Sequence, residues 1–190
     1  MRYLILIVAF LFSGCVGFKE LKPMNYFSIN SSSSLPKRVK YPDKTVKVAY
    51  PLALNRELGY NMDFEYIGGK KGSYLNSQWQ EPLARLIRAN IINSLNSAKV
   101  FKATLPLESS VIEDYRVEVT VNSFKNVIEN GVSYAVVDID VSLVNMNNRS
   151  ILKRRKFKYK KQADSLDAKG YAKAVNEIFK EFDRDLINWI

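Results

Sequence analysis

The sequence predicts a single α/β domain, in which a mixed sheet with an antiparallel meander packs against two main amphipathic helices. Two observations carry this prediction. Apolar and polar residues alternate strictly between residues 115 and 161, which is the period of half-buried strands. Apolar residues also recur at spacings of three and four after residue 82 and after residue 170, which is the period of helices with one buried face. The order of these segments fits an α/β or α+β domain.

The first third of the domain contains short strands separated by turn residues. Residues 26–29 fit a small edge strand, and a loop rich in serine and lysine follows. Residues 45–50 alternate and end at Pro51, so we expect a second strand there. Residues 64–67 and 73–75 flank two glycines, which predicts a hairpin.

A helix is expected to follow, with Ser77 and Gln80 at the spacing of a capping box. Pro82 suits the first turn, where its missing N–H costs nothing. The helix should end near Asn96, and an extended segment should begin at Val100. Its buried stripe is predicted to contain Leu83, Leu86, Ile87, Ile91 and Leu95.

Three strands then form the predicted meander, over residues 115–121, 135–143 and 151–161. The turns fall at 129–131 and 145–148. Each strand has one apolar and one polar face, which is typical of an antiparallel sheet covered on one side.

The chain closes with a second amphipathic helix, for which Asp164 or Ser165 is the expected cap. Gly170 falls in its first turns and should weaken it slightly. The predicted buried stripe consists of Tyr171, Val175, Ile178, Phe179, Phe182, Leu186, Trp189 and Ile190. The predicted element order is therefore β-β-β-α-β-β-β-β-α.

The residue types favour a non-catalytic protein. The chain has no histidine and one cysteine, so histidine-activated nucleophiles and the usual zinc sites are missing from it. Residues 68–72 are rich in glycine and lysine but lack the spacing of a phosphate-binding loop. Asp138 and Asp140 share one strand face, either as a carboxylate pair for acid–base chemistry or as part of a solvated face. We predict no catalytic residues, no metal site and no diffusible cofactor.

One charge pattern exceeds the background of this basic chain, whose formal net charge is +10. Seven of the nine residues 153–161 are cationic. Four of them point to one side of the strand and are called the basic stripe here: Arg154, Lys156, Lys158 and Lys160. The stripe suits an anionic lipid surface or an acidic partner. It equally suits an edge strand guarded by lysines, or cross-strand pairing with Asp138 and Asp140.

The N-terminus carries an export signal. Arg2 precedes an apolar run of about ten residues, roughly half of a membrane span, and the run leads to Ser13, Gly14 and Cys15. This layout resembles a bacterial lipoprotein signal, which implies cleavage between Gly14 and Cys15 and lipid on Cys15. The chain then divides into a signal peptide (1–14), a lipidated tether (15–25) and a periplasmic domain (26–190). Export excludes a nucleic-acid partner, and Val16 favours the outer membrane without excluding the inner one.

Several motifs together resemble the ABC-type transport auxiliary lipoprotein family, which includes paraquat-inducible protein C. They are the Ser13-Gly14-Cys15 signal, the segment Gln78-Trp79-Gln80-Glu81-Pro82-Leu83 that opens a helix, and the meander with its terminal helix. Tyr26-Phe27 and Asn55-Arg56-Glu57-Leu58 also fit. The resemblance implies a three-layer α/β domain, with Trp79, Glu81 and Pro82 as family-motif residues. Trp79 and Pro82 also suit a purely architectural role at the helix entrance.

The resemblance further implies a docking component rather than an enzyme. Such proteins work with an MCE-domain protein and an ABC transporter that move lipid between the two membranes, and a ring or other homo-oligomer is one arrangement. Two alternatives stay open. A direct lipid carrier would need an apolar pocket for acyl chains. An activator of cell-wall synthesis or of another envelope machine could use a similar domain.

Overall fold

The computed structural model describes residues 23–30, 35–53 and 58–190 of the chain. Gly14 and Cys15, and most of the 55–58 segment, lie outside this range. The described elements follow the predicted order, with a fourth strand in the first group. They are β1 (Asn25–Phe27), β2 (Tyr41–Val48), β3 (Asn61–Tyr66), β4 (Lys71–Trp79), α2 (Leu83–Ser97), β5 (Phe101–Pro106), β6 (Tyr115–Glu129), β7 (Val132–Asn145), β8 (Ser150–Gln162) and α3 (Ala168–Trp189).

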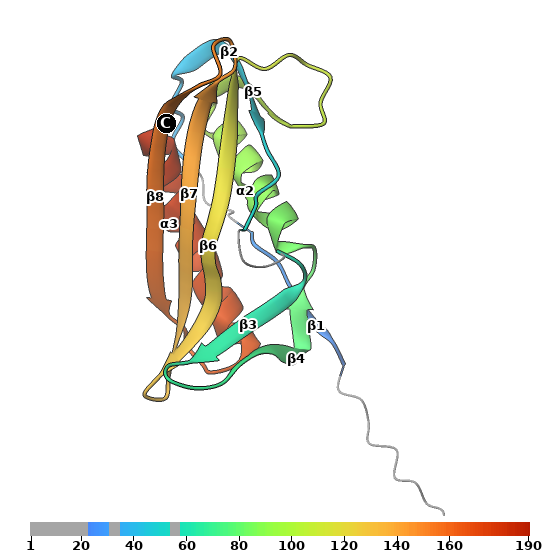
Figure 1. The fold of residues 1–190 in the computed structure, drawn as a ribbon, viewed down its shortest axis with the longest axis vertical. Helices are drawn as coiled ribbons and strands as arrows, with labels where there is room; N and C mark the ends of the chain where they lie inside the picture. Colours follow the sequence, from blue (N-terminus) through green and yellow to red (C-terminus); the bar gives the residue numbers. More distant parts are fainter. Residues whose placement is uncertain (1–22, 31–34, 54–57) are drawn as a thin grey trace, which may run out of the picture.

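The described strands form one eight-stranded mixed sheet that forks at β6. On one side, β6 pairs along its whole length with β7, which pairs with β8, both antiparallel. On the other side, β6 pairs in parallel with β2 near its start and with β3 near its end. One arm of the fork is therefore β2–β5, and the other is β3–β4–β1 (Figure 1). The predicted meander is confirmed, and it forms the stem of the sheet.

Both helices pack on the same face of this sheet (Figure 1). They touch each other through a buried hydrogen bond from the Asn90 amide to Asp183, with 2.6 Å between nitrogen and oxygen. The α/β class with a mixed sheet and two amphipathic helices is confirmed. The helices share one face rather than covering both, because the polar sides of the three meander strands all point the other way. The predicted helix stripes are buried, apart from the partly exposed Trp189.

A β-bulge at Asn122 explains how the long strand β6 keeps one apolar face. Val121 lies opposite Ile139, but Ser123 lies opposite Asp138, so Asn122 is the extra residue. Before the bulge the inward residues are odd-numbered, and after it they are even-numbered, namely Phe124, Asn126 and Ile128. The bulge lies where the sheet forks, between the contacts of β6 with the two arms.

Both predicted helix caps are wrong. Ser77 lies opposite Asn25 in the β1–β4 pairing, so it is a strand residue, and α2 begins after Pro82 without a side-chain cap. For α3 the cap is Asp167, whose carboxylate accepts a hydrogen bond from the Gly170 N–H at 2.8 Å. Pairing with β1 holds the chain extended past Ser77, whereas residues 164–167 form bends before α3 begins.

The entrance of α3 leaves no room for a side chain at Gly170. A Cβ placed on it would lie 2.3 Å from the Ser165 Oγ and 2.8 Å from the Ser165 backbone N and O. We expect Gly170→Ala to lower the free energy of unfolding by about 1–3 kcal/mol, since the backbone of the preceding loop must shift. Chemical denaturation measures this. Gly59→Ala is the matched control because nothing lies within 4 Å of its Cβ position, and an equal loss in both variants would contradict the account.

Candidate docking surface

The face of the sheet turned away from α2 and α3, called the outer face here, carries the basic stripe. The stripe residues lie on β8, which pairs only with β7 and so forms an edge of the described sheet. All four are exposed, whereas Phe157 on the other side of the strand is buried. The predicted orientation of these residues is therefore found in the structure.

The stripe lies directly across from acidic residues of β7. Lys156 and Lys158 are opposite Asp140 and Asp138 in the strand register. The Nζ of Lys158 lies 3.6 Å from Asp138, the Nζ of Lys156 lies 3.8 Å from Asp140, and a guanidinium nitrogen of Arg154 also lies 3.8 Å from Asp140. The two aspartates thus sit among cations on a solvated face. This geometry fits cross-strand pairing better than an acid–base pair, and such exposed pairs add little stability.

Asn122 connects this charged band to the fork of the sheet. Its side-chain amide donates to Asp138 at 3.0 Å and to Asp140 at 2.9 Å. Asn122 faces outward, as the alternation after Val121 requires, and the bulge then places Phe124 instead of Ser123 on the inner face. The polar surface therefore continues from β8 across β7 to β6.

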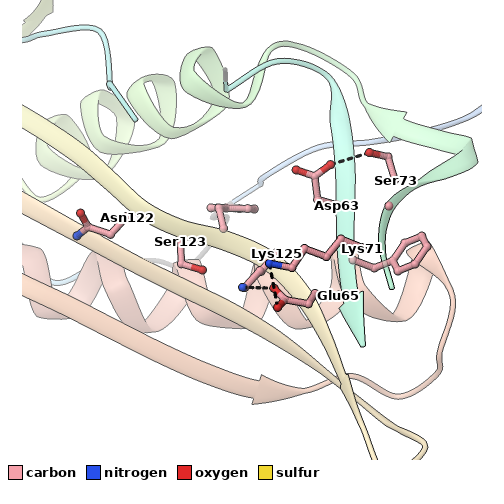
Figure 2. A pocket seen from close by; sticks show the side chains of 10 residues that line it. Asp63, Glu65, Lys71, Ser73, Asn122, Ser123 and Lys125 are labelled. Carbon is pink, nitrogen blue, oxygen red and sulfur yellow. Dashed lines mark hydrogen bonds and ion pairs between the residues drawn. The ribbon is translucent and has the colours of Figure 1, made fainter. Parts of the chain in front are cut away.

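Beyond Asn122 the outer face is hollowed, with a cavity of about 620 Å³ between β6 and the β3–β4 hairpin. Figure 2 shows Glu65 between two lysines: Lys125 of β6 forms an ion pair with it, and the Lys71 Nζ lies 3.3 Å away. The hydrogen bond from Lys125 holds the pKa of the Glu65 carboxyl below its ordinary value. Further along the β3–β4 hairpin, the Ser73 hydroxyl donates a hydrogen bond to the Asp63 carboxylate at 2.7 Å.

These charges decide what the hollow can bind. Its walls offer carboxylates, ammonium groups, hydroxyls and an amide, together with the ring of Phe64. Such a lining suits polar side chains of a protein partner, because each group can exchange an internal ion pair for one across an interface. It does not suit acyl chains, whose burial would leave the charged groups without water.

The family-motif residues lie at the entrance of α2, on the helix side. Trp79 is fully buried and packs edge-on against Phe124 and Tyr171, with ring centroids 5.9 Å apart in both pairs. Pro82 is the residue at which the backbone turns into the helix. Glu81 pairs with Arg85 one turn later at 2.9 Å. None of the three lies on the outer face, and the contacts of Trp79 and Pro82 are those of an architectural role.

The end of the domain near the β5–β6 loop contains a partly buried ion-pair cluster. Glu113 pairs with Arg116, and its carboxylate lies 3.1 Å from the Nζ of Lys47, a lysine that is only 7% exposed. The hydrogen bond from Arg116, helped by Lys47, lowers the pKa of Glu113 from 4.5 to about 2.

This pKa predicts an acid-dependent loss of stability. Because the folded pKa is below the unfolded one, the contribution of Glu113 is complete above pH 4.5 and disappears as the pH falls towards 2. We expect Glu113→Gln to lower the free energy of unfolding by about 3 kcal/mol at pH 7 and by much less near pH 2. Urea denaturation at several pH values measures this. A difference between the two proteins that stays constant with pH would contradict the assignment.

Sequence reasoning found the stripe and the two aspartates but missed the hollow. Glu65 and Lys71 are opposite each other in the β3–β4 hairpin, but Lys125 is 60 residues after Glu65, and the fork of the sheet brings it to them. The bulge did leave a signal: the apolar residues of β6 change from odd to even positions between Val121 and Phe124. That change of phase also moves Lys125 to the outer face.

The fold and this face define a class of protein: an α/β domain with one face buried by two helices and the other left as a polar surface. A family model supplies the name of the class. Residues 71–186, more than half of the chain, match the ABC-type transport auxiliary lipoprotein component. The chain therefore belongs to this family of bacterial envelope lipoproteins, as the sequence resemblance implied. No curated protein sequence is significantly similar to it.

Solved structures support the fold. Protein XCC0632 from Xanthomonas campestris superposes with a TM-score of 0.77 at 14% identity, over 87% of this chain and 93% of that one. The hypothetical protein CT253 from Chlamydia trachomatis gives a TM-score of 0.52 at 9% identity, over 77% of this chain and 97% of that one. Within the described part of the chain, neither helix has the length and apolar character needed to cross a bilayer.

Proposed function

We propose that this protein is a periplasm-facing docking component of an intermembrane lipid transport system, built from an MCE-domain protein and an ABC transporter. Cys15 carries the lipid that anchors it, in the outer membrane according to Val16. The observation that carries the proposal is the family match over residues 71–186, which makes the chain an auxiliary lipoprotein of ABC-type transport.

The outer face supplies the docking surface in this proposal. A partner that presents acidic side chains would meet the basic stripe and the two lysines of the hollow. The ion pairs already present are exposed, so exchanging them for pairs with a partner has a small cost. Electrostatic complementarity of this kind increases the association rate and selects the partner. A homo-oligomer that arranges several such faces around a partner is compatible with this role.

The direct lipid carrier is a weaker candidate. The largest side chains between sheet and helices, including Trp79, Phe124 and Phe179, are fully buried and pack on one another. The hollow between β6 and the β3–β4 hairpin has charged walls, and a second hollow beside α2 is lined mostly by polar amide and hydroxyl side chains. Measuring co-purified lipid by mass spectrometry after delipidation tests this alternative directly.

A double variant tests whether the basic stripe binds the transport partner. We expect Lys156→Gln with Lys158→Gln to weaken binding to the transport partner about 10-fold at low salt and less at high salt, because screening reduces such interactions. The fold should be unaffected, since both side chains are exposed. The matched control, Lys102→Gln with Lys169→Gln, removes the same charge from exposed positions outside the outer face. Equal weakening by both pairs would show that net charge, not the stripe, controls binding.

A further inference from the structure

The end of the β3–β4–β1 arm carries a group of exposed apolar side chains, called the arm tip here: Met24, Tyr26 and Leu75. Their exposed fractions are 42%, 61% and 90%. The three are neighbours because β1 and β4 run parallel, with Asn25 opposite Ser77. The Asn25 side chain also donates to the Asn76 carbonyl at 3.2 Å, which joins the two strands at this end.

An irregularity of β4 places Leu75 outside the core. Asp63 of β3 lies opposite Ser73, but Asn61 lies opposite Gln78, so β4 contains extra residues between these two pairings. Tyr74 turns inward, and its hydroxyl donates to the Leu166 carbonyl at 3.0 Å and accepts from Asn126 at 2.9 Å. Leu75 follows on the outside of this bend. Exposed apolar residues are ordinary, and the loop between β5 and β6 also carries three, Leu107, Val111 and Ile112. The arm tip differs from that loop because the chain enters the domain there.

The arm tip is also where the chain enters the domain. Pro23 is the first described residue and directly precedes Met24 and β1. Cys15 lies eight residues earlier in the sequence, a distance that extended chain spans in at most about 28 Å. Figure 1 places β1 at the lower end of the molecule and the β5–β6 loop at the upper end. A lipid on Cys15 would therefore hold the arm tip, rather than the loop, closest to the membrane.

We propose that the arm tip inserts into the interface of the membrane that holds the Cys15 lipid, and so fixes the orientation of the domain on that membrane. This inference rests on the proposed lipid anchor. A lipid at one point of the chain does not by itself fix the orientation of the domain. Contact at the arm tip adds a second attachment point and holds the β5–β6 end away from the bilayer.

The chemistry of the arm tip suits a bilayer interface. Tyrosine favours the headgroup region, where its ring meets apolar chains and its hydroxyl meets water. Methionine and leucine side chains gain by leaving water for the acyl boundary. Lys19 and Lys22, which the sequence places just before the arm tip, have the charge that anionic headgroups attract. A protein partner at this end is the competing occupant, and the experiment below separates the two.

Leu75 and Ile112 provide a matched pair of positions, because each is 90% exposed, one on β4 and the other in the loop between β5 and β6. The full chain is produced in cells with Leu75→Cys or Ile112→Cys, and the new thiol is labelled with an environment-sensitive fluorophore. Each protein is reconstituted into vesicles of phosphatidylethanolamine and phosphatidylglycerol, with or without lipids that carry a quencher below the headgroup. Vesicle flotation and the mass of the N-terminal peptide are measured on the same samples.

The expected result is that both proteins float with the vesicles and that only the label at position 75 is quenched, several-fold more strongly than the label at 112. Floating proteins in which both labels stay unquenched would overturn the arm-tip contact while leaving the lipid anchor intact. The arm-tip contact with the membrane would also be overturned if the label at position 75 is shielded from solvent only after a transport partner is added. Failure of both proteins to float, with no lipid mass on Cys15, would instead overturn the anchor itself.

Discussion

Replacing Trp79 with alanine is expected to destabilise the domain by about 3–5 kcal/mol, the largest effect of any single core change proposed for this chain. The indole is fully buried and joins three elements: Trp79 is the last residue of β4, and its ring contacts Phe124 of β6 and Tyr171 of α3. Its backbone N–H also donates to the Tyr60 carbonyl at 2.8 Å. Removing the ring leaves a cavity where the arm, the stem and the terminal helix meet.

Denaturant unfolding of the purified domain measures this loss. Trp79→Phe keeps part of the contact and should lose clearly less stability than Trp79→Ala. Tyr26→Ala, at an exposed position of the arm, is the control and should change stability by less than about 0.5 kcal/mol. If Trp79→Ala unfolds like the wild-type protein while partner binding is lost, the residue acts in recognition and its architectural assignment is wrong.

Replacing Cys15 with serine is expected to abolish lipid attachment, the largest functional effect predicted for the chain. Without the thiol, the lipid-dependent cleavage after Gly14 has no substrate. The N-terminal peptide should then lose its lipid mass, and residues 1–14 should remain on the chain. Stable attachment to a membrane takes two acyl chains or one chain with a second signal, so the loss should be evident in membrane fractionation.

Mass spectrometry of the N-terminal peptide gives the direct readout, because the uncleaved segment could by itself retain some protein at the membrane. Val16→Asp is the companion variant: it keeps the lipid and should move the protein towards the inner membrane if the sorting rule applies here. An unmodified Cys15 in the wild-type protein would contradict the anchor. It would leave the fold and the outer face unchanged.

The sequence was sufficient to predict the stem of the sheet and both helices. Alternation in β7 and on each side of the bulge in β6, and helical spacing in α3, are local signals, and they survive because each element has one buried face. The same holds for the basic stripe, since orientation along a strand follows from the period of two. The opposite orientations of Phe157 and Lys158 could be predicted without knowing which strands lie beside β8.

The fork, the hollow and the caps needed the tertiary structure. Pairing of Ser77 with β1 overrides a local capping signal, and the residues near Ser77 in the sequence do not predict that β1 is its partner strand. Glu65 and Lys125 meet only because β3 joins β6 beyond the bulge. At Gly170, helix propensity does not register the close approach of Ser165, five residues earlier. Contacts distant in the sequence decided the fork, the hollow and the start of α2, whereas local contacts decided the start of α3.

The most direct test of the docking role is crosslinking in living cells followed by purification of the tagged protein and mass spectrometry of its partners. Wild type, Cys15→Ser and the Lys156→Gln, Lys158→Gln variant are compared. The proposal predicts recovery of an MCE-domain protein with its ABC transporter from wild type, and reduced recovery from both variants. Recovery of cell-wall synthases instead, or of bound lipid with no protein partner, would contradict it.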